Sequence, residues 1–276
     1  IRKLIMSTTF KGYAVIVTGA GTGIGFGLGH AFAAAGAHVA LNDIDGDIAQ
    51  EAAAKINASL VREAVTPYAF DVADVDAVRA MVADVVQRHG RLDVAIANAG
   101  LSHFGRFLDY TPEAFERVTA VNLRGTYFTV QAAAQAMIAT KTKEGRLILM
   151  SSVTGSQAYP NLSAYGMTKA GIQHLAAVLA AELGRYAITV NAIAPGATVT
   201  ERTLADDPQY EANWQRVAPN QRVGYVEDIV QTALFLASPA ARHLSGQTMV
   251  VDGGWTKLSP IPEETPDLPT ESSKLR

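Results

Sequence analysis

The stretch that decides the fold is Thr18-Gly19-Ala20-Gly21-Thr22-Gly23-Ile24-Gly25, which stands between an apolar run and a helical pattern. Glycines let the backbone turn tightly and approach a pyrophosphate, and the amino end of a helix offers free N–H groups and a favourable dipole. Ile24 occupies the place of the third glycine of the Gly-x-Gly-x-x-Gly spacing. Four alternating glycines between a strand and a helix nevertheless predict a dinucleotide-binding turn.

Outward from this turn, apolar β-rich runs alternate with Ala-rich helical patterns. The predicted buried strands cover residues 13–18, 38–42, 65–70, 93–97, 146–150, 188–193 and 248–251. The predicted helices cover residues 24–35, 48–56, 75–88, 123–139, 164–183 and 227–236. Strict alternation predicts βαβ crossovers, and hence a Rossmann-like, doubly wound α/β domain with a seven-stranded parallel sheet and helices on both faces.

Two segments depart from this alternation. Residues 195–224 are polar and irregular, and a loop this long in a compact domain is usually functional, often a lid, although a surface excursion is the alternative. Beyond residue 255 the chain is rich in proline and acidic residues, which predicts an extended or disordered tail over 256–276. We expect one domain over residues 10–255, preceded by an N-terminal extension, 1–9.

Composition excludes several classes of protein. A net charge of -3 with mixed signs leaves no basic footprint for nucleic acid and no polybasic patch for a membrane surface. No run approaches the roughly 20 apolar residues that span a bilayer, and residues 1–5 are too short for a secretory signal. The chain has no cysteine, and no His/Asp/Glu cluster has metal-ligand spacing. We expect a cytoplasmic protein that binds no metal, nucleic acid or membrane.

The residue after the second predicted strand bears on cofactor choice. Asp43 follows Gly25 by eighteen residues, where an acid accepts hydrogen bonds from the adenosine ribose and repels a 2′-phosphate. No Arg or Lys lies between His38 and Gln50 to bind that phosphate. These residues predict NAD rather than NADP. The alternative is that Asp43 or Asp45 caps the next helix.

A tyrosine and a lysine four residues apart, Tyr165 and Lys169, predict proton-transfer chemistry. Residues i and i+4 share one helix face, so the ammonium can lie beside the phenol and favour its ionised form. Ser152 lies thirteen residues upstream of the tyrosine. The Tyr/Lys spacing alone is weak evidence, because it occurs by chance on many amphipathic helices.

Together these motifs resemble the short-chain dehydrogenase/reductase family, of the single-domain type, over roughly residues 10–255. The family's further segments are matched by Asp71-Val72, Asn98-Ala99-Gly100, Asn122, and Pro195-Gly196 followed by Thr200. The cofactor-binding residues that the resemblance implies, with Asp43, are Gly19, Thr22, Gly23, Ile24, Asp71, Val72, Asn98, Ala99, Gly100, Tyr165, Lys169, Pro195, Gly196, Thr198 and Thr200.

The resemblance also implies the catalytic residues. Tyr165 would exchange the substrate's hydroxyl proton, and Lys169 would lower its pKa and bind the nicotinamide ribose. Ser152 would hydrogen-bond the substrate oxygen. Asn122 would hold a water that connects Lys169 to solvent, or would only pack inside its helix. Ser151 should be supporting structure.

The substrate pocket should be walled by residues after Asn98-Ala99-Gly100, residues after Ser152, and the 195–224 loop. Beside Ser152 and Tyr165, the candidates are Ser102, His103, Gln157, Tyr159, Asn161, Thr198, Arg202 and Trp214. This set is rich in hydrogen-bonding groups, which suits a polyhydroxylated alcohol better than a steroid or a long acyl chain. The C-terminal half is also similar to the family's sugar and polyol dehydrogenases. A loop histidine is more often solvated than functional, so His103 is not assigned a catalytic role.

The leading hypothesis is NAD-dependent oxidation of a secondary hydroxyl of a sugar, polyol or similar small polar alcohol. One alternative is a ketone or 3-oxoacyl reductase, against which Asp43 argues because such enzymes usually use NADPH. Another is a non-catalytic NAD-sensing protein, against which the intact Ser152, Tyr165 and Lys169 argue. The resemblance further implies a homotetramer that assembles through the helices at 123–139 and 164–183 and through the last strand.

Overall fold

The computed structural model describes residues 10–258, so the predicted N-terminal extension and the tail from residue 259 lie outside the described part. Seven strands form one parallel sheet in the order β3-β2-β1-β4-β5-β6-β9, which confirms the predicted fold class. The strands are β1 Ala14–Val17, β2 His38–Asp43, β3 Val65–Ala69, β4 Val94–Ala97, β5 Gly145–Met150, β6 Ile188–Pro195 and β9 Thr248–Val251.

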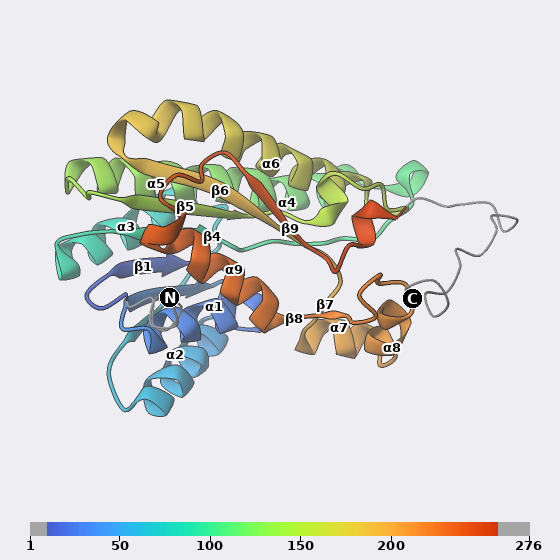
Figure 1. The fold of residues 1–276 in the computed structure, drawn as a ribbon, viewed down its shortest axis with the longest axis horizontal. Coiled ribbons are helices and arrows are strands. Elements are labelled where there is room, and N and C mark those ends of the chain that lie inside the picture. Colours follow the sequence, from blue (N-terminus) through green and yellow to red (C-terminus); the bar gives the residue numbers. More distant parts are fainter. Residues whose placement is uncertain (1–9, 259–276) are drawn as a thin grey trace, which may run out of the picture.

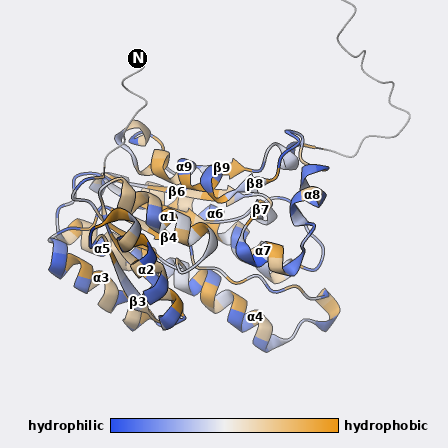
Figure 2. Ribbon diagram, turned by 90° about the horizontal axis from the view of Figure 1, so that it is seen from below, coloured by the Kyte–Doolittle hydropathy of each residue, from blue (hydrophilic) through white to orange (hydrophobic). Residues whose placement is uncertain are grey.

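Helices cover both faces of this sheet (Figure 1). One face packs against α1 Gly23–Ala34, α2 Gly46–Leu60 and α9 Val226–Ala237. The other face packs against α3 Val75–His89, α5 Thr126–Ala139 and α6 Ser163–Leu183. Every residue of β1 and β4 is buried, because a parallel sheet covered on both sides leaves neither face to solvent. Along α3, hydrophobic and hydrophilic residues alternate around the helix (Figure 2).

Capping side chains set where two of these helices begin. The Asp45 carboxylate accepts hydrogen bonds from the N–H groups of Asp47 and Ile48, so α2 begins earlier than the predicted residue 48. Asp74 starts α3 in the same way. The capping role considered for Asp43 or Asp45 therefore falls to Asp45.

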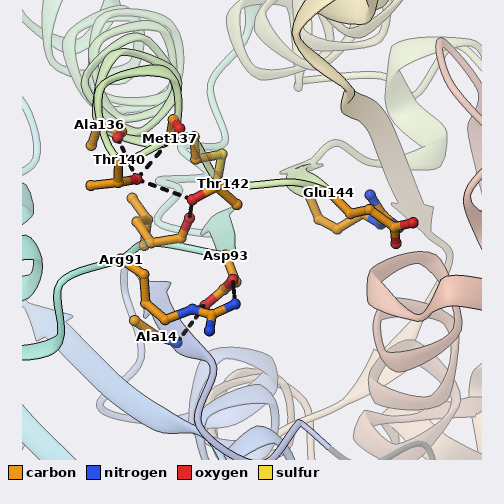
Figure 3. Close-up of polar contacts among 10 residues, drawn as sticks. Ala14, Arg91, Asp93, Ala136, Met137, Thr140, Thr142 and Glu144 are labelled. Atoms are coloured by element: carbon orange, nitrogen blue, oxygen red, sulfur yellow. Dashed lines mark hydrogen bonds and ion pairs between the residues drawn. The ribbon is translucent and has the colours of Figure 1, made fainter.

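The amino end of the sheet is held by a compact polar cluster (Figure 3). The buried Asp93 carboxylate accepts the Ala14 N–H at 2.9 Å and two donors of Arg91, at 2.8 and 2.6 Å. Nearby, the Thr142 hydroxyl donates to the Leu92 carbonyl at 3.0 Å. These contacts join the starts of β1 and β4 to the loop before β5.

A helix and a π-helical turn appear where the sequence analysis expected neither. The helix α4 Pro112–Thr119 begins with proline at its first position, and the Thr111 side chain caps it. The chain then widens into the π-helical turn η2 Ala120–Gly125, so α5 begins at Thr126 rather than at the predicted residue 123.

The expectation of an irregular segment over 195–224 is wrong. This segment contains the two-residue strand β7 Thr198–Val199, which pairs with β8 Gly224–Tyr225, and the short helices α7 Glu201–Asp206 and α8 Tyr210–Gln215. The Thr200 and Thr203 side chains form a reciprocal cap that starts α7. Both helices lie beyond the carboxyl ends of the strands (Figure 1).

The remaining described elements are short 3₁₀ turns, and none of the described helices is long and apolar enough to cross a membrane. These turns are η1 Phe107–Asp109, η3 Val153–Gly155, η4 Gly184–Tyr186, η5 Pro239–Ala241 and η6 Trp255–Lys257. The turn η6 includes the first two residues of the predicted tail.

Candidate active site

Two adjoining cavities open at the carboxyl ends of the strands. One, of about 420 Å³, lies along the glycine turn and the ends of β2 and β3. The other, of about 540 Å³, lies between β5, β6, α6 and the 195–224 segment. Both are lined by Ile24, Asn98, Gly100, Thr200 and Arg202, so these residues mark where the two spaces meet. We call them the dinucleotide cavity and the substrate cavity.

The glycine turn has room for backbone only. A Cβ on Gly25 would lie 2.1 Å from the Gly19 carbonyl oxygen, and one on Gly19, whose φ is +58°, would lie 2.6 Å from the Ala99 Cα. Asn98 fastens the turn, because its side-chain amide donates to the carbonyls of Thr18 and Gly19 at 3.0 and 2.8 Å. Thr22 makes no side-chain cap, so the first N–H groups of α1 remain available to a phosphate. The turn therefore fits a dinucleotide.

Asp43 faces this turn rather than the helix that follows. Its Oδ2 accepts the Gly21 N–H at 2.9 Å, and the residue lines the dinucleotide cavity. A Cβ at Gly21 would lie 2.8 Å from that same oxygen, so the close approach depends on glycine. The structure thus holds a carboxylate beside the glycine turn, where it could accept hydrogen bonds from the ribose of a bound dinucleotide.

The dinucleotide cavity also contains an ion pair that was not expected from the sequence. Asp71 Oδ2 lies 2.5 Å from Arg117 Nη1, and Asp71 Oδ1 accepts the Ala73 N–H at 2.9 Å. Burial tends to raise the pKa of Asp71, but the Ala73 N–H and Arg117 outweigh burial and hold this pKa below its ordinary value. Arg117 comes from α4, whose start is marked in the sequence by Thr111-Pro112.

Lys169 is buried at the wall shared by α6 and β5. Its side chain is 3% exposed, and Nζ donates to the Met150 carbonyl at 2.8 Å. Burial lowers the pKa of Lys169 to about 8, because the charged form loses water. Nζ lies 5.5 Å from the centre of the Tyr165 ring, so the predicted pair does share one helix face.

The pKa of Tyr165 is shifted opposite to the expected direction. Burial raises it, while the Ser152 side chain and the positive charge of Arg202 only partly oppose this rise. The expected lowering by Lys169 is not what governs the phenol in this structure, because removal of water from the phenolate outweighs the nearby charges.

Ser152 and Ser151 have different surroundings. Ser152 Oγ accepts hydrogen bonds from the Thr154 N–H at 3.2 Å and from the Thr154 hydroxyl at 3.0 Å, which leaves its own hydroxyl hydrogen to donate. Ser151 Oγ instead donates to the Lys169 carbonyl at 2.8 Å and accepts from Gln173 at 3.2 Å. Ser152 lines the substrate cavity as a donor, and Ser151 braces β5 against α6.

Asn122 is fully buried in the π-helical turn. Its side-chain amide exchanges two hydrogen bonds with the Leu101 backbone, at 2.8 and 3.0 Å, and donates to the Thr168 hydroxyl at 3.0 Å. A Cβ on Gly100 would lie 3.6 Å from Asn122 Oδ1 and 3.2 Å from Lys169 Nζ, so Gly100 allows both side chains to come close. The role of Asn122 in a water relay stays a prediction.

The substrate cavity includes part of the predicted substrate set. Ser102, Tyr159, Thr198, Arg202 and Trp214 line it, together with Ser152, Tyr165, Pro195 and Gly196. The cavity-lining residues that the sequence analysis did not name include Phe104, Thr203, Asp206, Asp207, Tyr210 and Trp255. The spacing of Tyr210 and Trp214 is the signal that could have found this part of the wall, because it places two aromatic rings on one face of a helix.

Three residues predicted to contact substrate are not among those that line the cavity: His103, Gln157 and Asn161. The His103 ring packs edge-on against Tyr110, 5.5 Å between ring centres. Asn161 is exposed, has a φ of +64°, and its carbonyl accepts the Gly105 N–H at 3.0 Å.

Aromatic rings form the far wall of the substrate cavity. The ring centres of Tyr210 and Trp214 lie 6.0 Å apart, and those of Trp214 and Trp255 lie 5.6 Å apart. Burial raises the pKa of Tyr210 to about 12, so its hydroxyl stays protonated at neutral pH.

In the described part of the chain, no three His, Asp or Glu side chains gather as they would around a metal ion.

Comparisons with known proteins identify the family of this chain. A family model described as enoyl-(acyl carrier protein) reductase matches residues 19–256. A short-chain dehydrogenase/reductase from Armillaria gallica is 38% identical over 251 residues, which cover 88% of this chain and 96% of that protein. The chain belongs to the short-chain dehydrogenase/reductase family. Members of this family are oxidoreductases that bind a nicotinamide cofactor.

Within the short-chain dehydrogenase/reductase family, two relatives are informative about substrate and cofactor. L-rhamnose 1-dehydrogenase (NAD(P)+) from a Sphingomonas species is 38% identical, covering 88% of this chain and 96% of that protein. A crystal structure of gluconate 5-dehydrogenase from Burkholderia cenocepacia, in complex with NADP and tartrate, has a TM-score of 0.83 to this chain. It is 33% identical and covers 91% of this chain and 98% of that one.

Proposed function

We propose that this protein is an NAD-dependent dehydrogenase that oxidises a secondary hydroxyl of a sugar, polyol or similar small polar alcohol. The observation that carries the proposal is the meeting of Ser152, Tyr165 and Lys169 at one cavity, whose other walls hold hydroxyls, charges and aromatic rings. Such a wall binds the hydroxyls and C–H faces of a polar alcohol better than it binds an extended acyl chain.

In the proposed mechanism the protein orients the alcohol and moves one proton. Tyr165 accepts the hydroxyl proton, or donates it to a carbonyl in the reverse direction. Ser152 donates its free hydroxyl hydrogen to the substrate oxygen and stabilises the charge that develops there. A bound nicotinamide dinucleotide supplies the ring carbon that accepts the hydride.

Lys169 has two tasks in this proposal. As a buried cation beside Tyr165, it favours the phenolate that accepts the proton. It also binds the nicotinamide ribose hydroxyls, which would be held at the boundary of the two cavities. Burial alone keeps the pKa of Tyr165 high in the free protein, so we expect the phenol to become an effective base only when the cationic ring of the oxidised cofactor lies beside it.

Asp43 supports NAD over NADP. Its carboxylate lies against the glycine turn, where it would accept hydrogen bonds from the two ribose hydroxyls and repel a 2′-phosphate. The Burkholderia relative was solved with NADP and the Sphingomonas relative is named for both cofactors, so the preference requires a direct test.

The double variant Asp43→Ala/Ile44→Arg tests the cofactor assignment. Removing the carboxylate and adding a cation should shift the ratio of kcat/KM for NAD to that for NADP toward NADP, by about 10- to 100-fold, the worth of one charge-assisted hydrogen bond. Binding of NADH and NADPH, followed by their own fluorescence, should shift in parallel. An unchanged preference between NAD and NADP would show that Asp43 does not set the choice of cofactor.

A substrate panel tests the reaction itself. NADH formation should be measured with sugars, polyols, hydroxysteroids and simple secondary alcohols, and we expect turnover to concentrate in the first two groups. A ketone or 3-oxoacyl reductase is the second candidate, because the matching family model carries the description of an acyl-carrier-protein reductase. Faster NADPH-dependent reduction of 3-oxoacyl thioesters than oxidation of any alcohol would favour it.

We further propose that the protein assembles as a homotetramer. A shallow apolar hollow of about 370 Å³ lies between α5 and α6, lined by residues that include Leu123, Tyr127 and Leu175. Tyr127 on α5 and Val178 on α6 are 45% and 39% exposed, which is unusual for large hydrophobic side chains on neighbouring helices. Light scattering of the purified protein should report four chains.

A further inference from the structure

Arg202 has no task in the mechanism proposed above, yet it lies where the dinucleotide and substrate cavities meet. It is the second residue of α7, and the reciprocal cap between Thr200 and Thr203 fixes where this helix begins. Its Nη2 donates to Ser102 Oγ at 2.7 Å and, more weakly, to the Ser102 carbonyl at 3.5 Å. Ser102 thereby ties the guanidinium across the cavity mouth.

Much of the guanidinium remains unused. Arg202 Nε lies 3.8 Å from Asp206 Oδ2, which is too long for a hydrogen bond, and both side chains are well exposed at 58% and 74%. Exposed ion pairs of this kind contribute little to the stability of the fold. Neither Nε nor Nη1 donates a hydrogen bond to any residue in the described part of the chain. A planar guanidinium with free N–H groups is suited to a carboxylate, which it can bind with two parallel hydrogen bonds.

Two other charged groups of the substrate cavity are already engaged. Lys169 donates to the Met150 carbonyl and is buried. The Asp207 carboxylate accepts the Gln209 N–H at 2.9 Å and the Asn213 amide at 3.1 Å. Arg202 and Lys169 are the described cations that line this cavity, and Arg202 is the one with more unused N–H groups.

Arg202 is also close enough to the reacting group to act on the same small molecule. Its charge lowers the pKa of Tyr165, against the larger effect of burial. Both residues line the one cavity of about 540 Å³, and the aromatic wall of Tyr210, Trp214 and Trp255 offers the carbon skeleton a surface. Both side chains therefore line the space that one small molecule would occupy.

We propose that the substrate is a hydroxy acid, such as a sugar acid, whose carboxylate binds Arg202 while its hydroxyl meets Tyr165 and Ser152. This inference rests on the proposed dehydrogenase function and narrows its substrate class. Ser102 is the positioning residue that holds the guanidinium toward the cavity.

Matched pairs of substrates test this proposal. Each pair is an aldonate and the alditol of the same carbon skeleton, for example D-gluconate and sorbitol, across several stereochemistries. Wild-type protein should prefer the aldonate, and Arg202→Gln should lower kcat/KM for it by about 10- to 100-fold while changing the alditol by less than about 3-fold. Arg202→Lys, which keeps the charge but not the planar fork, should retain part of the preference.

Arg216→Gln is the matched control. Arg216 follows α8 in the same segment, bonds Ala212 and Asn213, and does not line the cavity. It should behave as wild type toward both members of every pair. If Arg202→Gln instead leaves the aldonate-to-alditol ratio unchanged, or only raises KM for the cofactor equally with both substrates, the carboxylate assignment is overturned while the dehydrogenase function stands.

A binding measurement separates failure of this inference from failure of the proposed function. The chain has two tryptophans, and both Trp214 and Trp255 line the substrate cavity, so intrinsic tryptophan fluorescence reports on its occupancy. In a Tyr165→Phe background with NAD, aldonates should bind saturably and Arg202→Gln should abolish that binding. If wild-type protein oxidises neither member of any pair, the proposed dehydrogenase function fails, and the carboxylate assignment is then tested by this titration alone. Aldonate binding that Arg202→Gln leaves unchanged, or no binding of any aldonate, would overturn the carboxylate assignment.

Discussion

Polar groups at the two ends of the same sheet differ in how fully other residues engage them. At the amino end, the Asp93 carboxylate is satisfied by Ala14 and Arg91, and the contacts close on themselves (Figure 3). At the carboxyl end, Ser152 keeps a hydroxyl hydrogen to donate, and Arg202 keeps unused N–H groups. The comparison therefore distinguishes an end that stabilises the fold from an end that is shaped for ligands.

The largest expected effect is on turnover and comes from a substitution at the carboxyl end of the sheet. Tyr165→Phe removes the proton acceptor and should lower kcat by about 10²- to 10⁴-fold, because that is the usual contribution of a positioned acid or base. The melting temperature should stay within error or rise slightly, since a buried hydroxyl is removed. Steady-state kinetics and thermal unfolding check both parts.

Tyr186→Phe is the control for that variant, because Tyr186 lies in η4, is 38% exposed and bonds only Arg185 through its hydroxyl. It should change neither quantity. A Tyr165→Phe protein with full turnover on every accepted alcohol would refute the mechanism.

An intermediate effect, on stability rather than on turnover, comes from a substitution at the amino end of the sheet. Asp93→Ala leaves the Ala14 N–H without its acceptor and Arg91 without its partner, which should lower the free energy of unfolding by about 2–3 kcal/mol. The kcat of the folded fraction should be unchanged. Urea unfolding measures the loss, and Asp76→Ala, whose pair with Arg79 is exposed, should cost less than about 0.5 kcal/mol.

If Asp93→Ala instead lowered kcat while leaving stability intact, the two ends would not divide their tasks in the way that the contacts indicate.

The smallest expected effect is a pH dependence of the free energy of unfolding that comes from Lys169, a residue of the candidate active site. Burial lowers the pKa of Lys169 from 10.5 to about 8, so between these values the unfolded chain holds a proton that the folded chain has lost. The free energy of unfolding of wild-type protein should therefore rise with pH over this window, relative to Lys169→Met. From pH 8 to 9.5 the gain should be on the order of 2 kcal/mol.

Urea midpoints of cofactor-free wild-type and Lys169→Met proteins at several pH values check the sign. The exposed Lys143→Met serves as the control and should run parallel to wild type. A difference that stays flat from pH 8 to 10 would mean that Lys169 is not held in a dry site.

Much of the fold could be predicted because the buried strands are short, apolar and regularly spaced. The last strand, β9 Thr248–Val251, has the predicted bounds, and the others differ by one or two residues at their ends. The helix α4 was missed although Thr111-Pro112 marks its start. The π-helical turn at Asn122 has no local signal, because contacts of this side chain with Leu101 and Thr168 accompany it.

The candidate site divides in the same way. The residues close to the strand ends, such as Asp43 and Ser152, could be placed from the sequence because a parallel sheet brings its carboxyl ends to one edge. The substrate wall could be predicted only in part. Arg202 and Trp214 line the cavity as predicted. His103, Gln157 and Asn161 have suitable side chains but do not line it, while Tyr210 and Trp255, which were not predicted, do.

The sequence by itself determined the order of strands and helices, the glycine turn and the one-face spacing of Tyr165 and Lys169, because these depend on neighbours a few residues apart. Only the tertiary structure decided which side chains share a cavity. Ser102 and Arg202 are a hundred residues apart and meet at 2.7 Å, and burial rather than a neighbouring charge sets the pKa of Tyr165. Both depend on how segments far apart in the sequence pack against one another, which no local sequence pattern specifies.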